Sequence, residues 1–387
     1  MNRFGITLWL MGLAVALCLP SLAGTEYVIV NNGNYVSNSA ILYKLNRRTG
    51  KLAKIAVLHT GGQGFRGFEA DPAQVEEAVT QGAGCIYIFD DGSSDIAAFS
   101  KATSYKRVGK YFNSQLIAGE YGGSVALTPN GQFLYSSYSD TGYIGAWKVN
   151  TDCTLTFLAS YFDDYTLGPV RITPNGRYLV NSSAQSWAAL WAIDGTTGGL
   201  TSLNGVSFDT SACARTSYCT PYGLDITKDS KFVVFASYAS NVTRQYIMPV
   251  ALTARITSNG LTNPRIWVLK NSSDLRVNYF PFFSAAGYAG SGALYFGAEN
   301  FGDYTPGVLT THFTESPMSF KVTNATAVDP QVGNIAVTGN LMVVAQPPDQ
   351  IGVFRIQKDG SLKLLTTKTI DEQGEGLFSL SIFPNTR

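Results

Sequence analysis

The hydrophobic and polar positions of this chain alternate with a period of two over short stretches that end in polar turns. Residues 351–365, "IGVFRIQKDGSLKLL", read as an apolar strand, a turn and a second strand, and residues 144–158, "IGAWKVNTDCTLTFL", repeat that pattern. Residues 40–55 and 188–203 carry it again with a turn one residue longer. Period-two alternation interrupted by Gly or Asp at a turn is typical of a β-hairpin. The chain therefore repeats one hairpin unit along its length.

Further apolar runs accompany the hairpins, and they give the number of units. They start at residues 27, 86, 133, 178, 232, 294 and 341, so successive starts lie 45 to 62 residues apart. Periods of this size with four strands each are typical of propeller blades, because one blade cannot bury both of its faces alone. We predict an all-β fold, a seven-bladed β-propeller of four-stranded antiparallel blades. Two separate sandwiches are the alternative, but no linker interrupts the repeat.

The order of strands within a unit predicts how the ring closes. The chain begins with a strand of the second type at Tyr27 and ends with a strand of the innermost type, "LFSLSIF", at residues 377–383. We therefore expect the N- and C-terminal strands to pair in one blade, which removes the open edges of the ring.

The N-terminal segment "MNRFGITLWLMGLAVALCLPSLAG" has the layout of a secretory signal peptide. Arg3 precedes a long apolar run, and Ser21 and Ala23 are small residues at a cleavage site before Gly24. We expect residues 1–23 to be a signal peptide and residues 24–387 to form a single propeller domain that is secreted or periplasmic. A membrane anchor is the alternative, although the apolar run is short for a span. After cleavage we expect no membrane attachment.

Composition narrows the range of partners and cofactors. The net charge is +1 and only 14% of residues are charged, so we expect no nucleic-acid partner. Cys213 and Cys219 enclose five residues and are expected to form a disulfide in an exported protein. Cys85 and Cys153 are expected to be buried and unpaired. With two histidines and no C-x-x-C spacing, we expect no metal site and no cofactor.

The blade pattern resembles a known family. "YVIVNNGNYVSNSAILYKLNRRTGKL", from residue 27, is similar to the opening blade of lactonase-type seven-bladed propellers, which include 6-phosphogluconolactonase-like proteins and carboxy-cis,cis-muconate cyclases. "TPNGQFLYSSYSDTGYIGAWKV" and "TPNGRYLVNSSAQSWAALWAI" are similar to that family's turn–strand–strand unit. The resemblance covers essentially the whole mature chain and implies a metal-free enzyme that opens or forms a lactone.

The chain departs from that family at its catalytic positions. The resemblance implies a His in one inner strand, an Arg-His pair in the next and a Glu shortly afterwards. The matching positions here hold Gly122 and Gly123, then Gly168 and Pro169, and then Ser182. None of the family's catalytic roles can therefore be assigned to a matching residue, and whether the chain is an enzyme stays open.

Polar residues expected around the mouth of the channel supply other candidates. The loops into the inner strands and the turns between second and third strands share one face of a propeller, where many groups can contact one ligand. Glu120, Asp164 or Glu375 could activate water as a general base, with Arg171 stabilising the oxyanion. Ligand-binding positions are expected at Arg66, Tyr121, Tyr165, Tyr222 and Tyr279. The alternative is that these are solvated or ion-paired loop residues.

Three aspartates in "FDDGSSDIAAF", at residues 89–99, raise the question of a calcium site. Asp90, Asp91 and Asp95 could supply oxygen ligands, but the closing Glu of a calcium loop is absent. We interpret the segment as an Asp-Gly hairpin turn.

Two functions remain for the chain. The first is a secreted lactonase-like enzyme acting on a sugar acid or a muconate-like acid without a metal. The second is a non-catalytic propeller that binds a glycan, a small molecule or a protein through an aromatic loop face that includes "YFPFF" at residues 279–283. In either case we expect a monomer with a small-molecule or carbohydrate ligand at the channel mouth.

Overall fold

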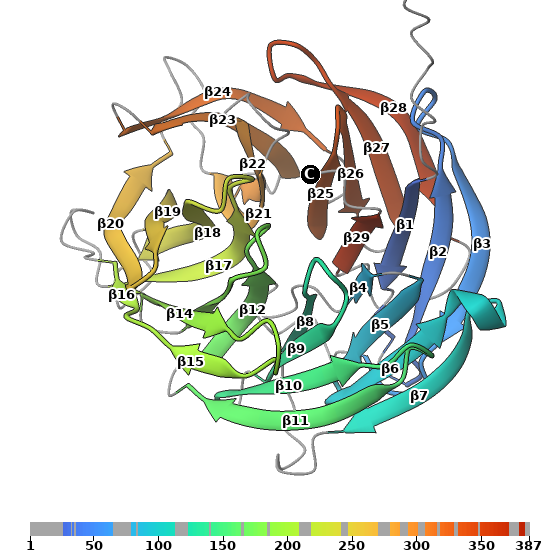
Figure 1. Ribbon diagram of the computed structural model, residues 1–387. Helices are drawn as coiled ribbons and strands as arrows, with labels where there is room; N and C mark the ends of the chain where they lie inside the picture. The colour runs from blue at the N-terminus through green and yellow to red at the C-terminus, as the bar shows by residue number, and fades with distance from the viewer. Residues whose placement is uncertain are drawn as a thin grey trace, which may run out of the picture.

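Seven β-sheets stand around a common axis like the blades of a propeller (Figure 1). In each blade the strands run antiparallel from the centre to the periphery. The computed structural model describes residues 26–31, 33–34, 36–64, 79–82, 84–112, 123–138, 141–163, 166–183, 186–208, 218–240, 247–269, 279–286, 293–300, 306–315, 318–328, 332–346, 349–370 and 379–383.

We number the blades in chain order and give their strands from the centre outwards. Blade 1 consists of β29 (Ser379–Phe383), β1 (Glu26–Asn31), β2 (Ser39–Leu45) and β3 (Leu52–His59). Blade 2 consists of β4 (Val79–Gly82), β5 (Cys85–Asp90), β6 (Asp95–Ser100) and β7 (Lys106–Phe112). Blade 3 consists of β8 (Gly123–Leu127), β9 (Phe133–Tyr138), β10 (Tyr143–Val149) and β11 (Leu155–Phe162). Blades 4 and 5 consist of β12 (Thr166–Ile172), β13 (Tyr178–Ser183), β14 (Trp187–Ile193), β15 (Leu200–Ser202) and β16 (Val206–Ser207), which also pairs with β14; and β17 (Tyr218–Ile226), β18 (Phe232–Ser240), β19 (Ile247–Thr257) and β20 (Gly260–Val268). Blades 6 and 7 consist of β21 (Tyr279–Ala286), β22 (Ala293–Asn300), β23 (Pro306–Glu315) and β24 (Met318–Ala327); and β25 (Asn334–Thr338), β26 (Leu341–Gln346), β27 (Gln350–Ile356) and β28 (Leu362–Thr369). A 3₁₀ turn, η2 (Lys101–Thr103), joins β6 to β7.

The predicted blade count and the predicted strand starts are confirmed. The second strands begin within one residue of the positions where the apolar runs start. These strands lie between two neighbouring strands and two neighbouring blades, so every residue of β5, β9 and β26 is buried. The outer strands β3 and β28 are buried on only part of their surface. Within the described residues, no helix is long and apolar enough to span a membrane.

The ring closes through the two ends of the chain, as predicted. β1 pairs antiparallel with β29, with Tyr27 opposite Phe383 and Asn31 opposite Ser379. The rings of Tyr27 and Phe383 stack with their centroids 5.2 Å apart. Blade 1 therefore combines an inner strand from the end of the chain with three strands from its beginning.

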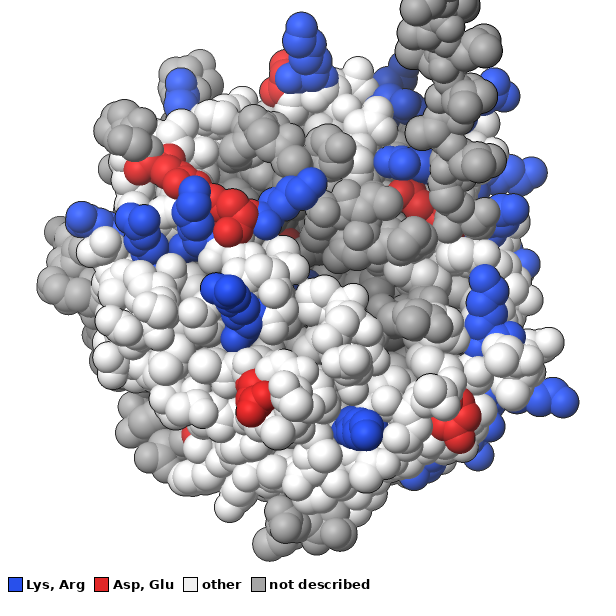
Figure 2. All heavy atoms as spheres, in the orientation of Figure 1, with Lys and Arg blue, Asp and Glu red and all other residues white. Residues whose placement is uncertain are grey.

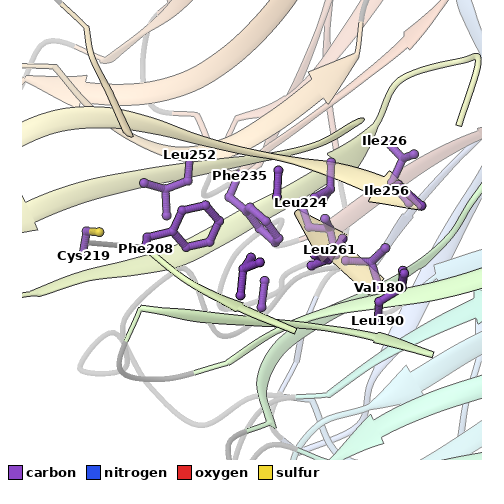
Figure 3. Packing of buried hydrophobic residues seen from close by; sticks show 14 of the residues in the cluster. Val180, Leu190, Phe208, Cys219, Leu224, Ile226, Phe235, Leu252, Ile256 and Leu261 are labelled. Carbon is purple, nitrogen blue, oxygen red and sulfur yellow. The ribbon is translucent and has the colours of Figure 1, made fainter. Parts of the chain in front are cut away.

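The hydrophobic core is distributed over the seams between blades. Figure 3 shows the cluster between blades 4 and 5, where Val180 and Leu190 face Leu224 and Phe235. Phe208 packs edge-on against Phe235 at 5.8 Å. Flat blades pack face to face only when their apolar side chains interdigitate, so each seam is a separate small core.

The repeated Thr-Pro-Asn-Gly turns fix the start of the second strand. The hydroxyl of Thr128 accepts a hydrogen bond from the amide of Phe133 at 3.0 Å, and Thr173 does the same for Tyr178 at 3.0 Å. A hydroxyl that satisfies the first amide of a strand makes the turn and the strand start one unit.

The disulfide pairing differs from the prediction for Cys85 and Cys153. Both are buried, as expected, but they form a disulfide with Cα atoms 5.4 Å apart. Cys85 begins β5 in blade 2, and Cys153 lies in the β10–β11 turn of blade 3. Their separation of 68 positions in the sequence gives no local sign of pairing, because the two cysteines meet only when neighbouring blades stack. Cys213 lies outside the described residues; Cys219 is buried.

Candidate functional site

The ring has two rims, and the predicted ligand face is one of them. We call it the loop rim: the edge where an outer strand leads to the next inner strand and where second and third strands join, as between β5 and β6 at residues 91–94. The predicted site residues Arg66, Glu120, Tyr121, Asp164, Tyr165 and Glu375 lie outside the described residues. Arg171, Tyr222 and Tyr279 fall on inner strands.

Three consecutive blades supply these inner-strand positions. Arg171 lies on β12, Tyr222 on β17 and Tyr279 at the start of β21, and these inner strands are neighbours in the ring (Figure 1). Tyr222 falls at a register shift between Pro221 and Leu224.

Arg171 links blade 4 to blade 5. Its Nε–H donates a hydrogen bond to the carbonyl oxygen of Leu224 on β17 at 3.0 Å, and its side chain is partly buried. The guanidinium is therefore held in a defined place at the seam. This hydrogen bond gives Arg171 a structural role, which the sequence did not indicate.

The segment "YFPFF" is not a loop. Residues 279–283 belong to β21, the inner strand of blade 6, and pair with β22 from Asn300 backwards. The aromatic face proposed for ligand binding therefore has no loop at this position. The prediction was wrong because residues 249–284 were interpreted as one long insertion that ends in this segment, whereas β19, β20 and β21 occupy most of that range.

Polar side chains tie the inner strands of blades 3, 4 and 5 to the preceding blade. The amide of Gly123 donates to Asp91 at 3.0 Å, and the amide of Val170 donates to Ser124 at 2.8 Å. In the next seam the amide of Cys219 donates to Ser186 at 3.0 Å. These bonds position the segments that enter the channel wall.

The aspartates of residues 89–99 lie in the hairpin that was predicted for them. Asp90 ends β5 and pairs directly with Asp95, which begins β6, and residues 91–94 form the turn. All three aspartates are buried. The hairpin interpretation is confirmed, but the sequence did not reveal that the carboxyl groups are removed from water.

Asp91 stands beside the entrance to blade 3. Its Oδ1 accepts the hydrogen bond from Gly123, which is the first residue of inner strand β8. Burial raises the pKa of Asp91 to about 7, although the hydrogen bond from Gly123 opposes that rise. A carboxyl group at the loop rim therefore titrates near neutrality.

Asp90 is more strongly perturbed. Burial raises the pKa of Asp90 to about 8, with a further contribution from the neighbouring charge of Asp95, while the hydrogen bond from Asn38 acts in the opposite direction. The side-chain amide of Asn38 donates a hydrogen bond through Nδ2 to Asp90 Oδ1 at 2.7 Å. Asn38 precedes β2, so this bond joins blade 1 to blade 2.

Residues 60–64 of blade 1, which follow β3, are fastened to blade 2 from two sides. On one side Lys110 Nζ donates to the carbonyl of Gly61 at 3.0 Å, and Arg107 donates to the carbonyl of Thr60. On the other side the amide of Gln63 donates to Ser93 Oγ at 2.9 Å. We call residues 60–64 the latch loop. It leads towards residue 66, so blade 2 determines where this stretch of the loop rim begins.

The described residues contain no group of three or more His, Cys, Asp or Glu side chains that could hold a metal ion. At the aspartate hairpin the cation beside Asp95 is Lys110, whose Nζ lies 2.9 Å from Asp95 Oδ2. The charge of Asp95 is therefore balanced by a side chain of the protein, Lys110.

Positive charge gathers on one flank of the ring. Figure 2 shows blue side chains along the right-hand side, where Figure 1 places β2, β3 and β28. Among the described residues of blades 7, 1 and 2, the exposed acidic side chain is Asp359, whereas exposed basic side chains are Lys44, Arg48, Lys51, Lys54, Lys101, Lys106, Arg107, Lys110, Lys358 and Lys363. The small net charge of the chain hides this asymmetry.

Comparisons with known proteins bear on the fold. No protein-family model matches the chain, and no curated protein matches its sequence. Solved structures do match. The chain resembles the periplasmic gluconolactonase PpgL of Pseudomonas aeruginosa with a TM-score of 0.66 and 13% identity, over 93% of this chain and 99% of that chain.

Two further structures give similar values. A candidate 6-phosphogluconolactonase of Bacteroides fragilis matches with a TM-score of 0.65 and 15% identity, over 94% of this chain and 99% of that one. A protein from Lactobacillus plantarum matches with a TM-score of 0.67 and 14% identity, over 93% and 99% of the two chains. The resemblance to lactonase-type seven-bladed propellers is thus confirmed for the fold.

Proposed function

We propose that the chain is an exported lactonase-like propeller that opens or forms the lactone of a sugar acid or a muconate-like acid without a metal. The observation that carries this proposal is the match in fold, over more than nine-tenths of the chain, to a gluconolactonase. Because one fold hosts many activities, the chemistry must come from residues of this chain.

The chemistry needs a base and a group that stabilises negative charge. Glu120, Asp164 and Glu375 are the proposed general bases for water attack on the lactone carbonyl, and Arg66 or Arg171 is the proposed partner of the oxyanion. Glu120 comes three residues before Gly123, whose amide Asp91 holds. Tyr121, Tyr165, Tyr222 and Tyr279 are the proposed contacts to the ring and hydroxyl groups of the ligand.

The test is hydrolysis of a panel containing gluconolactone, a phosphorylated sugar lactone and a muconolactone, followed as acid release above the spontaneous rate. We expect one substrate class to be turned over in the presence of a chelator. One of Glu120→Gln, Asp164→Asn and Glu375→Gln should lower kcat by about 100-fold or more, as loss of a general base does. Asp359→Asn, at an exposed turn of blade 7, is the matched control.

The alternative is a non-catalytic propeller that binds a glycan, a small molecule or a protein. The absence of the family's His, Arg and Glu at the matching positions favours it. A lactone or sugar acid that raises the melting temperature without being turned over would establish this alternative and overturn the enzyme. If no member of the panel either binds or reacts, both the enzyme and a sugar-acid binder are wrong.

Export and monomeric state are part of the proposal. Expression of the full chain in a bacterial host should give a mature protein that begins at Gly24 and elutes as a monomer in light scattering. Retention of residues 1–23 on the purified protein would contradict export by a cleaved signal peptide.

A further inference from the structure

The Asp90–Asp95 pair holds two acceptor atoms that nothing in the described structure satisfies. The two residues face each other at the last register pair of the β5–β6 hairpin. Asp90 Oδ1 accepts from Asn38 at 2.7 Å, and Asp95 Oδ2 accepts from Lys110 at 2.9 Å. The other oxygen of each carboxyl group is buried without a hydrogen-bond partner. Two orphaned carboxylate oxygens side by side would be strongly unfavourable in both hydrogen bonding and charge.

One proton resolves both deficits. A proton on one carboxyl group donates to the other, so the two orphaned oxygens become donor and acceptor of a single hydrogen bond. The side chains of Asp90 and Asp95 lie within hydrogen-bond reach of each other. Two like carboxyl groups so placed cannot both ionise readily in a buried site, and the common outcome is that they share a proton.

The surrounding charges agree with a single proton. From β7, Lys110 forms an ion pair with Asp95, and Arg107 donates to the carbonyl of Thr60. From the turn, Asp91 is engaged with the amide of Gly123. Residues 60–64 contribute no ionisable side chain, and Asn38 is neutral. Two buried carboxyl groups that share one proton carry a single negative charge, which the partly exposed ammonium group of Lys110 balances.

A metal ion fits the pair less well than a proton. Gly62 packs so closely on Asp90 that a Cβ at this position would collide with Asp90 Oδ2 and Cγ, and it would lie 2.7 Å from Ser93 Oγ. A calcium ion needs six to eight oxygen ligands around it, and this packing leaves no room for that shell.

We propose that Asp90 and Asp95 share one proton at neutral pH, and that this proton locks the latch loop of blade 1 onto blade 2. Loss of the proton places two negative charges beneath Gly62. The bonds from Asn38, Arg107 and Lys110 then have to hold the latch loop against that repulsion. The pair thus sets the pH above which the loop rim between blades 1 and 2 loosens.

The direction of the pH effect follows from the electrostatics. The pKa of Asp90 is raised to about 8 by burial first and by Asp95 second. The proton is therefore present in the native protein at neutral pH and is lost as the pH rises through this value. The inference concerns the seam itself and does not depend on the proposed enzymatic activity.

Infrared difference spectroscopy tests the shared proton directly. A protonated carboxylic acid gives a carbonyl stretch separate from the carboxylate bands. We expect the spectrum of the wild type minus that of Asp90→Asn to contain this stretch at neutral pH and to lose it on the alkaline side of pH 8. The matched control, Asp359→Asn, removes an exposed carboxylate. The spectrum of the wild type minus that of this control should contain no protonated-acid stretch.

A second variant keeps the test decisive. If Asp90→Asn does not fold, Asp95→Asn provides the same comparison from the other side of the hairpin. The stretch that Asp91 contributes is common to both proteins and cancels in the difference spectrum. If the wild type minus a folded variant of either residue shows no protonated-acid stretch at neutral pH, the shared proton is overturned. Limited proteolysis tests whether the proton locks the latch loop onto blade 2. If cleavage within residues 60–78 does not increase on the alkaline side of pH 8, that part of the proposal is overturned.

Discussion

Two seams of the same ring are held together by different physical means. Between blades 5 and 6 the contacts are aromatic: Phe232 meets Phe313 edge-on at 5.2 Å, and Trp267 stacks on Phe320 at 6.0 Å. Between blades 1 and 2, at the loop rim, buried carboxyl groups, an ammonium group and main-chain hydrogen bonds make the joint. Both seams have an apolar core, and an exposed ion pair between Lys231 and Glu315 also crosses the aromatic one. The aromatic seam therefore depends mainly on apolar burial, whereas the loop-rim end of the polar seam depends on which groups carry a proton.

The two seams therefore differ in how strongly their contribution to the free energy of unfolding depends on pH. Apolar packing contributes free energy that changes little with pH, so the aromatic seam behaves as a fixed joint. The polar groups of the other seam contribute less free energy, because burial of a charge has a large desolvation cost. Their contribution can, however, be altered by the gain or loss of one proton. The predictions below alter one seam at a time.

The largest loss of stability is expected at the aromatic seam. Phe296 is fully buried in β22 and packs against Phe320 at 5.9 Å. Phe296→Ala should lower the free energy of unfolding by about 3–5 kcal/mol, as other large core truncations do. Denaturant melts should show the same loss at neutral and alkaline pH; a loss that depends strongly on pH would contradict an apolar seam.

The disulfide sharpens the comparison, because it ties blade 2 to blade 3. Replacement of Cys85 and Cys153 together by Ser releases a loop of 68 residues in the unfolded chain. Loop-closure entropy for this length gives a loss of about 4 kcal/mol at most. Melts of the variant against the oxidised wild type measure it, and an unchanged midpoint would contradict a structural bond.

The third effect is a gain of stability that grows as the pH rises between the unfolded and native pKa values of Asp90. The unfolded form of Asp90 loses its proton near its ordinary pKa of 3.8, while the native form keeps it to about 8. Across this window the unfolded state binds fewer protons, so the free energy of unfolding of the wild type falls as the pH rises and levels off above 8. Asp90→Asn removes the contribution of Asp90 to this fall and leaves that of Asp91, whose pKa burial raises to about 7. The variant should therefore be more stable than the wild type on the alkaline side by a few kcal/mol.

That prediction is checked by chemical denaturation over the whole pH range. The exposed residue Asp359, whose pKa is lowered by hydrogen bonds from Ser361, provides the control variant Asp359→Asn, and it should leave the fall in place. Parallel curves for the wild type and Asp90→Asn would be incompatible with a buried proton at this position.

The smallest effect concerns the cation of the polar seam. Lys110→Met removes the ammonium group beside Asp95 and the hydrogen bond to Gly61. We expect a loss of about 1 kcal/mol at neutral pH, because the ammonium group is partly exposed. The fall of stability should also extend to higher pH, since the pair then holds its proton more tightly. A shift of the fall to lower pH would show that Lys110 acts in another way.

Most of the architecture could be predicted from local patterns. Phe133, Tyr178 and Leu341 begin second strands where the apolar runs predicted them, and Tyr27 pairs with Phe383 as the order of strands required. These features are local because a strand, its turn and its partner follow one another in the chain. The pairing of the N- and C-terminal strands is not local. It could still be predicted, because the chain begins with a second strand and ends with an inner strand.

Contacts between blades could not be predicted in the same way. Cys85 and Cys153 meet across a seam, and so do Asn38 and Asp90 and likewise Arg171 and Leu224. Each depends on how two repeats stack, which the alternation within one repeat does not encode. The burial of Asp90 is hidden for the same reason, because an aspartate in a hairpin turn is ordinarily solvated.

Native-state hydrogen exchange on the two seams tests the central claim most directly. Exchange of the β5–β6 amides and of the β22–β23 amides is followed by mass spectrometry on the acid and the alkaline side of pH 8, with correction for the intrinsic rates. The account predicts that alkali lowers the protection of β5–β6 and leaves that of β22–β23 in place, and that Asp90→Asn reduces the loss in β5–β6 to the part that belongs to Asp91. Equal changes in both hairpins, or a loss in β5–β6 that is as large in Asp90→Asn as in the wild type, would contradict it.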